Sequence, residues 1–267
     1  MKIVVLAKQV PDTRCVGKDA MKEDGTVNRA VLPAIFNPDD MNALEQALRL
    51  KERYPNVTVE VLTMGPDRAK EVIREGLYRG ADGGVLLSDK KFAGSDTLAT
   101  SYTLAQALCK MEPLLVFAGR QAIDGDTAQV GPQVAHKLNW PQVTYAEEVI
   151  DVDFALNTIT VKRRLDRGIE VVRTPLPAVI TVHGSAPSCR PRHAKRLLTY
   201  KNDAHIPQWG VADVGGDEKR YGLTGSPTKV KKIENIVLQE KESKRFGSSE
   251  NEINELLIEL INSHILG

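Results

Sequence analysis

Residues 119–131 have the sequence GRQAIDGDTAQVG and follow the uninterrupted apolar run at 114–118. A run of this kind is typical of a strand that is covered on both faces of a parallel sheet. Two aspartates then flank a glycine, and the residues that follow have the pattern of a helix. The stretch therefore predicts a polar loop at the carboxyl end of a buried strand, with a helix after it.

The first two thirds of the chain repeat this alternation. Apolar β-rich runs alternate with segments of helical period, at residues 3–7, 39–53, 57–64, 70–78, 84–88 and 96–111. Such alternation predicts an α/β fold with parallel βαβ units and right-handed crossovers. After Trp140, four short β-rich segments follow one another and predict antiparallel additions to a mostly parallel sheet, at 143–152, 158–165, 170–173 and 178–182. Residues 16–36 are expected to form a small hairpin.

The composition excludes several classes of protein. Lys and Arg number 36 and Asp and Glu 35, so no global field favours nucleic acid or an anionic membrane. No apolar run approaches the ~20 residues that a membrane span needs. The three cysteines are far apart and predict neither a disulfide framework nor a metal site. We expect a cytoplasmic protein that binds neither nucleic acid nor membranes.

The chain loses its regularity at about Gly184. Residues 184–248 are rich in Pro, Gly and basic residues and are expected to form an extended partner-recognition loop and arm after an α/β domain at 1–183. Residues 249–267 then predict an amphipathic helix, with Ser249 and Glu252 as a capping box. Its apolar face is expected to dock on this chain's own domain or on a partner, and the length of the arm favours the partner.

Ligands of an open parallel sheet collect outside the carboxyl ends of its strands. The opening stretch lies at such an end, and so do the loops that begin at Ala7 and Thr63. Small residues at Ala7, Gly65 and Gly119 would let a flat heterocycle approach the backbone. We therefore expect these three loops to form one ligand site.

The helix after the opening stretch has two possible starts. Gly131 can cap it with Pro132 at the first position, or Asp126 or Thr127 can cap a longer helix. In either case free backbone N–H groups would form a phosphate site, to which Thr127 adds a hydroxyl and Gln129 an amide. Ordinary turn and cap chemistry explains the same residues. Neither a dinucleotide-binding fingerprint nor a Walker A motif is present.

A second candidate phosphate site lies at 94–101. Ser95, Asp96 or Thr97 can cap the helix that follows, and Thr97 and Thr100 place hydroxyls in its first turn. A helix cap with a polar flank is an equally good interpretation.

Several motifs together resemble the β subunit of electron transfer flavoproteins. They are AKQV at 7–10, NP at 37–38 followed by ALEQALRLKE, MGP at 64–66, REGLYRGAD at 74–82 and GRQAIDGDTAQVGP at 119–132. The resemblance runs from residue 1 to about 183. It implies a Rossmann-like fold of the adenine nucleotide α-hydrolase-like type, and a larger α subunit that carries an FAD as partner. In the simple branch the β subunit holds a structural AMP, whereas in the electron-bifurcating branch it holds a second FAD and receives NADH.

Three segments resemble the bifurcating branch, at 8–13, 37–45 and 96–102, and Ala128-Gln129-Val130 stands where AMP-binding relatives tend to have Asn-Gln-Thr. The resemblance therefore implies FAD, with AMP as the alternative, and NADH as electron donor. The implied acceptors are ferredoxin and, through the α subunit, an acyl-CoA dehydrogenase-like reductase of an enoyl-CoA. The alternatives are a non-bifurcating carrier and an adenine-nucleotide sensor.

The resemblance also assigns roles to residues. Adenosine would lie against Ala7, Met64 and the loop at 124–130, in which Asp124 would accept from ribose or brace the loop. The pyrophosphate would meet the backbone at 129–131. The implied cofactor-binding residues are Ala7, Met64, Asp96, Thr97, Thr100, Asp124, Thr127, Ala128, Gln129, Val130, Gly131 and Arg164. Arg164 or Arg163 would lie near the isoalloxazine, and no catalytic side chain or metal is implied. The segment at 186–198 departs from the family's usual recognition loop, which docks the dehydrogenase.

Overall fold

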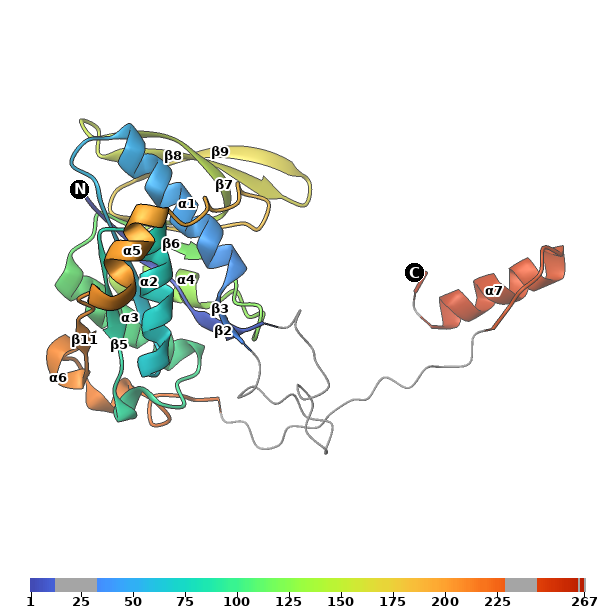
Figure 1. Cartoon of the computed structure of the whole chain (residues 1–267). Coiled ribbons are helices and arrows are strands. Elements are labelled where there is room, and N and C mark those ends of the chain that lie inside the picture. The colour runs from blue at the N-terminus through green and yellow to red at the C-terminus, as the bar shows by residue number, and fades with distance from the viewer. Residues whose placement is uncertain (13–32, 229–243, 264, 267) are drawn as a thin grey trace.

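The computed structural model describes residues 1–12, 33–228, 244–263 and 265–266 (Figure 1). Most of the hairpin expected at 16–36 lies outside these residues. Its last part forms β3 (Ala34–Phe36), which pairs antiparallel with β2 (Gln9–Pro11) in a small separate sheet.

Within the described residues the main sheet has nine strands, in the order β11-β5-β4-β1-β6-β10-β7-β8-β9. Neighbours from β11 to β7 are parallel, whereas β8 and β9 continue the sheet antiparallel. The expected α/β class with a mostly parallel sheet is confirmed. The strands are β1 (Lys2–Leu6), β4 (Thr58–Met64), β5 (Gly83–Leu87), β6 (Leu115–Gly119), β7 (Gln142–Asp153), β8 (Thr158–Leu165), β9 (Gly168–Pro175), β10 (Ala178–Val182) and β11 (Gln208–Trp209).

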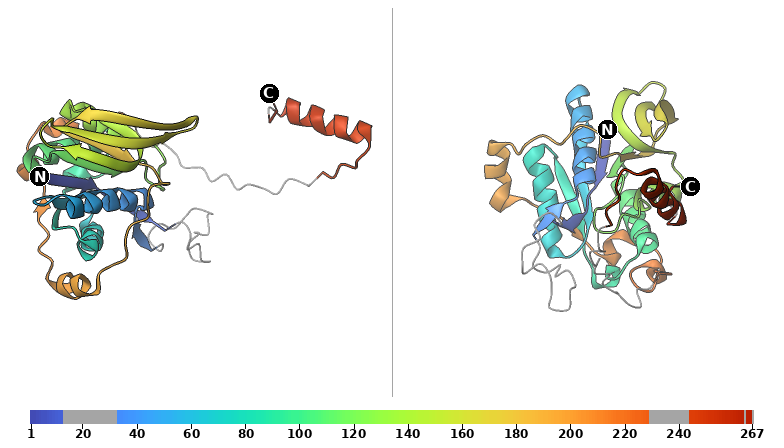
Figure 2. Two further views of the ribbon diagram at one scale, coloured as in Figure 1. Left: turned by 90° about the horizontal axis from the view of Figure 1, so that it is seen from above. Right: turned by 90° about the vertical axis from the view of Figure 1, so that its right-hand side faces the viewer.

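Helices cover both faces of the sheet (Figures 1 and 2). Ile3 and Val5 of β1 pack into a core with α1 (Pro38–Arg53) and α2 (Lys70–Arg79). The alternate residues Val4 and Leu6 pack on the opposite face with α3 (Thr97–Met111) and α4 (Val130–Leu138). Because successive side chains of a strand point to opposite faces, a strand that is covered twice must be apolar throughout.

The helices change sides between β1 and β6. The crossovers through α1 and α2 lead from β1 to β4 and β5 along one face, and α3 returns the chain to β6 along the other. The carboxyl ends of β1 and β6 therefore flank a topological switch point, where connecting loops diverge and leave a crevice. The polar loop of residues 119–131 begins at this point.

Two expectations about the second half of the chain are wrong. β10, at 178–182, was expected to be antiparallel, but it lies between β6 and β7 and is parallel to both. The chain reaches this position by leaving the edge strand β9 and crossing back toward the middle of the sheet. Residues 184–248 were expected to form an extended loop and arm, but those described up to residue 228 are not extended throughout. They instead contain α5 (Ala194–Asp203), β11 at the edge of the sheet, α6 (Val211–Val214) and the 3-10 turn η4 (Glu218–Arg220).

Arginines fasten the segment after β10 to the domain. The Arg190 guanidinium donates to Glu45 of α1, with Nε 2.9 Å from Oε2 and Nη2 3.0 Å from Oε1, and also pairs with Glu52. Arg196 of α5 donates to the carbonyl oxygens of Leu77 and Ala81 at the end of α2. Long polar side chains thus hold a segment with few apolar residues against two helices. The division of the chain into an α/β domain, an arm and a terminal helix, with boundaries at residues 183 and 248, stays a prediction.

The last helix of the chain, α7 (Glu250–Asn262), is capped by Ser249, whose Oγ accepts from the Glu252 N–H at 3.4 Å. None of its residues is buried, and Ile253, Leu257, Ile258 and Ile261 are between 43% and 58% exposed. None of the helices in the described ranges is long and apolar enough to cross a membrane.

Candidate functional site

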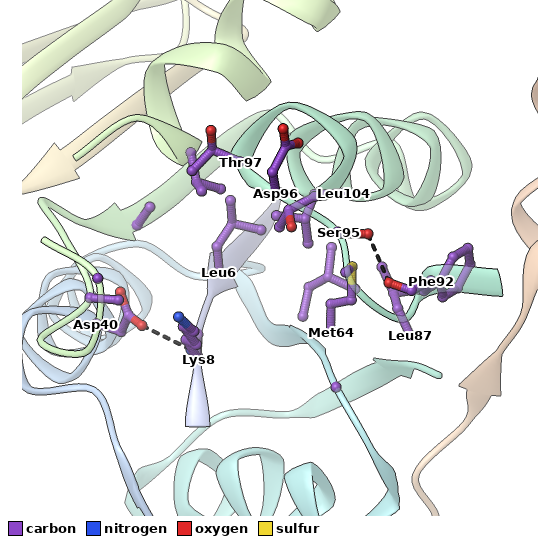
Figure 3. A pocket seen from close by; sticks show the side chains of 18 of the residues that line it. Leu6, Lys8, Asp40, Met64, Leu87, Phe92, Ser95, Asp96, Thr97 and Leu104 are labelled. Atoms are coloured by element: carbon purple, nitrogen blue, oxygen red, sulfur yellow. Dashed lines mark hydrogen bonds between the residues drawn. The ribbon is translucent and has the colours of Figure 1, made fainter. Parts of the chain in front are cut away.

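A cavity of about 830 Å³ lies at the switch point. Its walls come from the carboxyl ends of β1, β4, β5 and β6 and from the first residues of α3 and α4 (Figure 3). Sites for small molecules in proteins measure ~300–1,000 Å³, so this cavity is near the upper end of that range. It has the volume of a site for a large ligand.

The three loops expected at one site all reach this cavity. Every residue of the predicted set lines it except Asp124 and Arg164; the lining members are Ala7, Met64, Asp96, Thr97, Thr100, Thr127, Ala128, Gln129, Val130 and Gly131. The assignment of these residues to a cofactor stays a prediction, but the fold brings them together.

Asp124 lies outside the cavity lining and braces the loop instead. Its carboxylate accepts from Lys8 Nζ at 2.7 and 2.9 Å, which ties residues 119–131 to the loop after β1. Asp96, in contrast, lines the cavity as the cap of α3: Oδ1 accepts from the N–H groups of Leu98 and Ala99 at 2.9 and 3.0 Å. Burial opposes ionisation of Asp96, but these backbone donors and that of Thr228 lower its pKa.

Neither expected start of the helix after residue 126 is correct. α4 begins at Val130, with Gln129 as N-cap residue and no capping side chain. Gln129 instead turns to the other helix, where its Oε1 accepts from Thr97 Oγ1 at 2.8 Å. This bond brings the N-termini of α3 and α4 to one side of the cavity. The start of α4, which has no capping side chain, favours an anion in this space, whereas the Asp96 carboxylate already accepts from the N–H groups at the start of α3.

The loop before α4 is held in an unfavourable backbone conformation. Asp126 and Ala128 have φ of 48° and 53°, in the left-handed region that residues with a Cβ seldom adopt. Both residues line the cavity. Strain of this kind costs of order 1–3 kcal/mol per residue and concentrates at binding sites, where the surrounding structure enforces it.

Sequence reasoning missed the buried carboxylate that joins two of the strand tips. Asp40 is 7% exposed, and its Oδ1 accepts from the Gly119 N–H while Oδ2 accepts from the Lys8 N–H, both at 2.9 Å. Burial raises the pKa of Asp40 to about 7. Asn37 adds a second link, because its side chain donates to the carbonyl oxygen of Gln121 and accepts from the Ile123 N–H. The motif NPDD at 37–40 contains Asp40, but acidic residues in the first turn of a helix are too common for this one to be recognised as special.

Arg120 presents an unpaired donor beside the cavity that it lines. Its Nε is buried, makes no hydrogen bond, and has Asp39 Oδ2 as its nearest carboxylate oxygen at 3.8 Å. A buried donor without a partner costs free energy unless a ligand or water accepts from it.

The comparisons with known proteins agree with this geometry. A family model for the electron transfer flavoprotein domain matches residues 24–202. An electron transfer flavoprotein subunit beta from Clostridium acetobutylicum is 46% identical over 238 residues, which cover 87% of each chain. The caffeyl-CoA reductase-Etf complex subunit CarD of Acetobacterium woodii is 44% identical over 86% of each chain. Protein FixA of Rhizobium meliloti is 39% identical over 98% of this chain and 90% of that protein.

The chain belongs to the electron transfer flavoprotein β-subunit family. Proteins of this family transfer electrons, bind flavin and AMP in general, and pair with an α subunit. The cavity fits such a ligand on two counts: an uncapped helix N-terminus for phosphate, at α4, and a strained loop at the cavity wall. The described residues contain no cluster of side chains suited to a metal ion.

Arg164, for which the flavoprotein resemblance implied a place at the isoalloxazine, lies away from the cavity lining. It pairs with Glu147, whose Oε1 also accepts from Ser185 Oγ at 2.5 Å. These two hydrogen bonds lower the pKa of Glu147 and hold it ionised. The Arg164 side chain is still 50% exposed, so this flavoprotein subunit presents a cation on its surface.

The pKa of Asp40 predicts a pH-dependent stability. Between about pH 4 and about pH 7 the folded chain holds a proton that the unfolded chain has released, so the free energy of unfolding falls as the pH rises through this window and levels off above it. Asp40→Asn should reduce this slope, of which Asp39 keeps a part because burial also raises its pKa, and, because asparagine accepts only one of the two N–H groups, should lower stability by about 1–3 kcal/mol. Urea unfolding across the window measures both effects. Asp67→Asn, at an exposed carboxylate, is the control, and a slope as steep in Asp40→Asn as in the wild type would contradict the assignment.

Proposed function

We propose that the chain is the β subunit of an electron-bifurcating flavoprotein, which binds FAD at the switch-point cavity and receives electrons from NADH. One electron passes to ferredoxin. The other passes through the α-subunit FAD to an acyl-CoA dehydrogenase-like enoyl-CoA reductase. The observation that carries this proposal is the cavity of about 830 Å³ that reaches the uncapped N-terminus of α4, because it has the volume for a large ligand and a place for its negative charge.

One relative supports the choice of a reductase as partner. CarD is named as a subunit of a caffeyl-CoA reductase-Etf complex, and it matches this chain at 44% identity along most of both proteins. That name describes an enoyl-CoA reductase joined to an electron transfer flavoprotein. NADH and ferredoxin, the donor and acceptor of the proposal, are found in the cytoplasm, which is therefore the proposed compartment.

The chain's own residues would bind and orient the cofactor. Free backbone N–H groups at the start of α4 would hold phosphate, and the Thr97–Gln129 bond would keep this helix end beside the start of α3. The Asp40 carboxylate would keep the loops around the cofactor in place. When bound, FAD supplies the hydride and electron chemistry, so no side chain need act as nucleophile or general acid.

The amount of flavin in the heterodimer tests the proposal. The chain purified with its α subunit should contain two flavins per heterodimer, one on each subunit. Denaturation, followed by absorbance and chromatography of the released nucleotides, counts them against the protein. One flavin and one AMP per heterodimer would instead establish the non-bifurcating alternative. Nucleotide binding without any flavin would leave the sensor alternative.

A charge placed at the start of α3 tests the position of the phosphates. Thr97→Glu puts a carboxylate at the first position of the helix, where the dipole favours it, so the fold should survive. The same carboxylate repels a phosphate in the cavity, and flavin on this subunit should fall at least tenfold. Leu98→Glu adds the same charge one residue further on, outside the cavity lining, and should keep its flavin. Full flavin content in Thr97→Glu would exclude this end of the cavity as the place of the phosphates.

We further propose that α7 docks on the α subunit. Its apolar stripe is exposed along the whole helix, and Ile258 and Ile261 remain 58% and 56% exposed. A stripe of this kind gains free energy when it is covered, at ~25 cal/mol per Å² of apolar surface. The partner in this family is an α subunit, so we propose that a surface of the α subunit covers the apolar stripe of α7.

Truncation after residue 248 tests this docking. The shortened chain should keep the thermal unfolding temperature of the α/β domain, because no residue of α7 is buried against it. Its affinity for the α subunit should fall by at least tenfold in a binding titration. Ile258→Asp should have a similar but smaller effect, while Glu255→Gln, on the same helix, should leave the affinity near that of the wild type. Unchanged affinity after truncation would exclude the α subunit as the partner of α7.

A further inference from the structure

A second depression lies on the other side of α3, separate from the cavity. It has a volume of about 360 Å³. Its lining residues are Leu98, Tyr102, Lys137, Lys219, Arg220, Thr224, Gly225, Ser226 and Pro227. Thr97 lines the cavity and Leu98 the depression, so a single helix, ~10–12 Å across with its side chains, separates the two.

Three cations surround this depression without ion pairs. In the part of the chain that the structure describes, Lys137, Lys219 and Arg220 have no carboxylate within 4 Å. Arg220 lies over the ring of Tyr102, with Cζ 4.0 Å from the ring centroid, and Lys137 Nζ lies 6.0 Å from the same centroid. Burial and the Arg220 charge lower the pKa of Lys137, although Asp96 opposes this.

The acids nearest to this cluster have other partners. Glu218 pairs with Lys91 at 2.7 Å, and Asp217 accepts from the Lys219 N–H at 3.0 Å as a cap of η4. Asp96 accepts from three backbone N–H groups, at Leu98, Ala99 and Thr228. The chain as a whole is almost neutral, so this concentration of unpaired positive charge is a local feature.

Aromatic rings join the depression to the cavity. Phe92 lines the cavity, and its ring centroid lies 5.2 Å from that of Tyr221, which in turn lies 5.2 Å from that of Tyr102 in the depression. Phe92, Tyr221 and Tyr102 are 4%, 2% and 6% exposed, so the rings form a continuous dry contact. Figure 3 shows Phe92 on its 3-10 turn at the cavity wall, beside Met64 and Leu87.

We propose that the depression around Tyr102 is the docking surface for an acidic iron–sulfur protein that accepts the low-potential electron. This inference rests on the proposed function and adds the place at which the acceptor binds. Carboxylates of the partner would pair with Lys219, Lys137 and Arg220, which steers association and fixes the orientation. One electron leaves the reduced cofactor and reduces one ferric iron of the partner to ferrous iron, and no bond forms or breaks. The aromatic contact gives this surface a packed path to the cavity wall.

Binding of a ferredoxin to the intact heterodimer tests the proposal without reliance on turnover. A purified acidic [4Fe–4S] ferredoxin is titrated into the wild-type complex and into Lys219→Glu and Lys137→Glu complexes by calorimetry at low and at physiological salt. Each reversal should weaken binding roughly 5- to 20-fold at low salt and reduce the salt dependence of the affinity. Lys195→Glu, which reverses an exposed unpaired charge on α5, is the matched control and should bind as the wild type does.

Three outcomes would overturn the inference. Ferredoxin affinity that is unchanged in both lysine variants would place the acceptor elsewhere. An equal loss of ferredoxin affinity in Lys195→Glu would indicate a general effect of charge on binding. Pyrophosphate that binds the wild type and not Lys219→Glu, with ferredoxin affinity unchanged, would make the depression a small-anion site.

Flavin counts on the same samples keep this result separate from the proposed function. Two flavins per heterodimer with unchanged ferredoxin affinity in the variants would reject the docking surface alone. One flavin and no ferredoxin binding in the wild type would reject the proposed function.

Discussion

The site depends on one constraint: loops that leave two parallel strands in different directions must be held together at their base. Asp40 does this, because one carboxylate accepts from backbone N–H groups after β1 and at the end of β6. Gly119 is required at the second of these positions, since a Cβ there would lie 2.4 Å from Asp40 Oδ1. The burial that makes the bonds strong also raises the pKa of the carboxyl group to about 7. Burial of Asp40 therefore explains both the strength of these hydrogen bonds and their sensitivity to pH.

Local chemistry allowed the sequence to predict much of the fold and part of the site. The apolar run at 114–118 had to be a doubly covered strand, and Asp96 capped its helix as its side chain and position suggest. The start of α4 was mispredicted because a tertiary bond decides it: Gln129 bonds to Thr97 on another helix, which no pattern within residues 119–131 could indicate. Asp40 was missed for a similar reason, because its function depends on two backbone groups far away in the sequence.

The errors in the second half of the chain concern topology and short elements. A β-rich segment such as β10 carries no information on which strands it will join, so an order in which the chain crosses back to the middle of the sheet has to be observed. Residues 184–228 have few apolar residues and short elements, and they fold because the domain offers partners to Arg190, Arg196 and Tyr221. Composition describes such a segment as polar, but it does not reveal the surfaces to which the segment binds.

The ion pairs of Arg190 have a mechanical consequence. Glu45 and Glu52, which hold Arg190, belong to the same helix as Asp40, and Glu45 lies less than two turns from it. A helix of this length behaves as a stiff rod. A protein that pulled on the segment around residue 190 would therefore apply its force to α1, and α1 would transmit that force to the carboxylate between the strand tips. Contact at the outer surface and the spacing of the loops around the cavity are in this way linked through one helix.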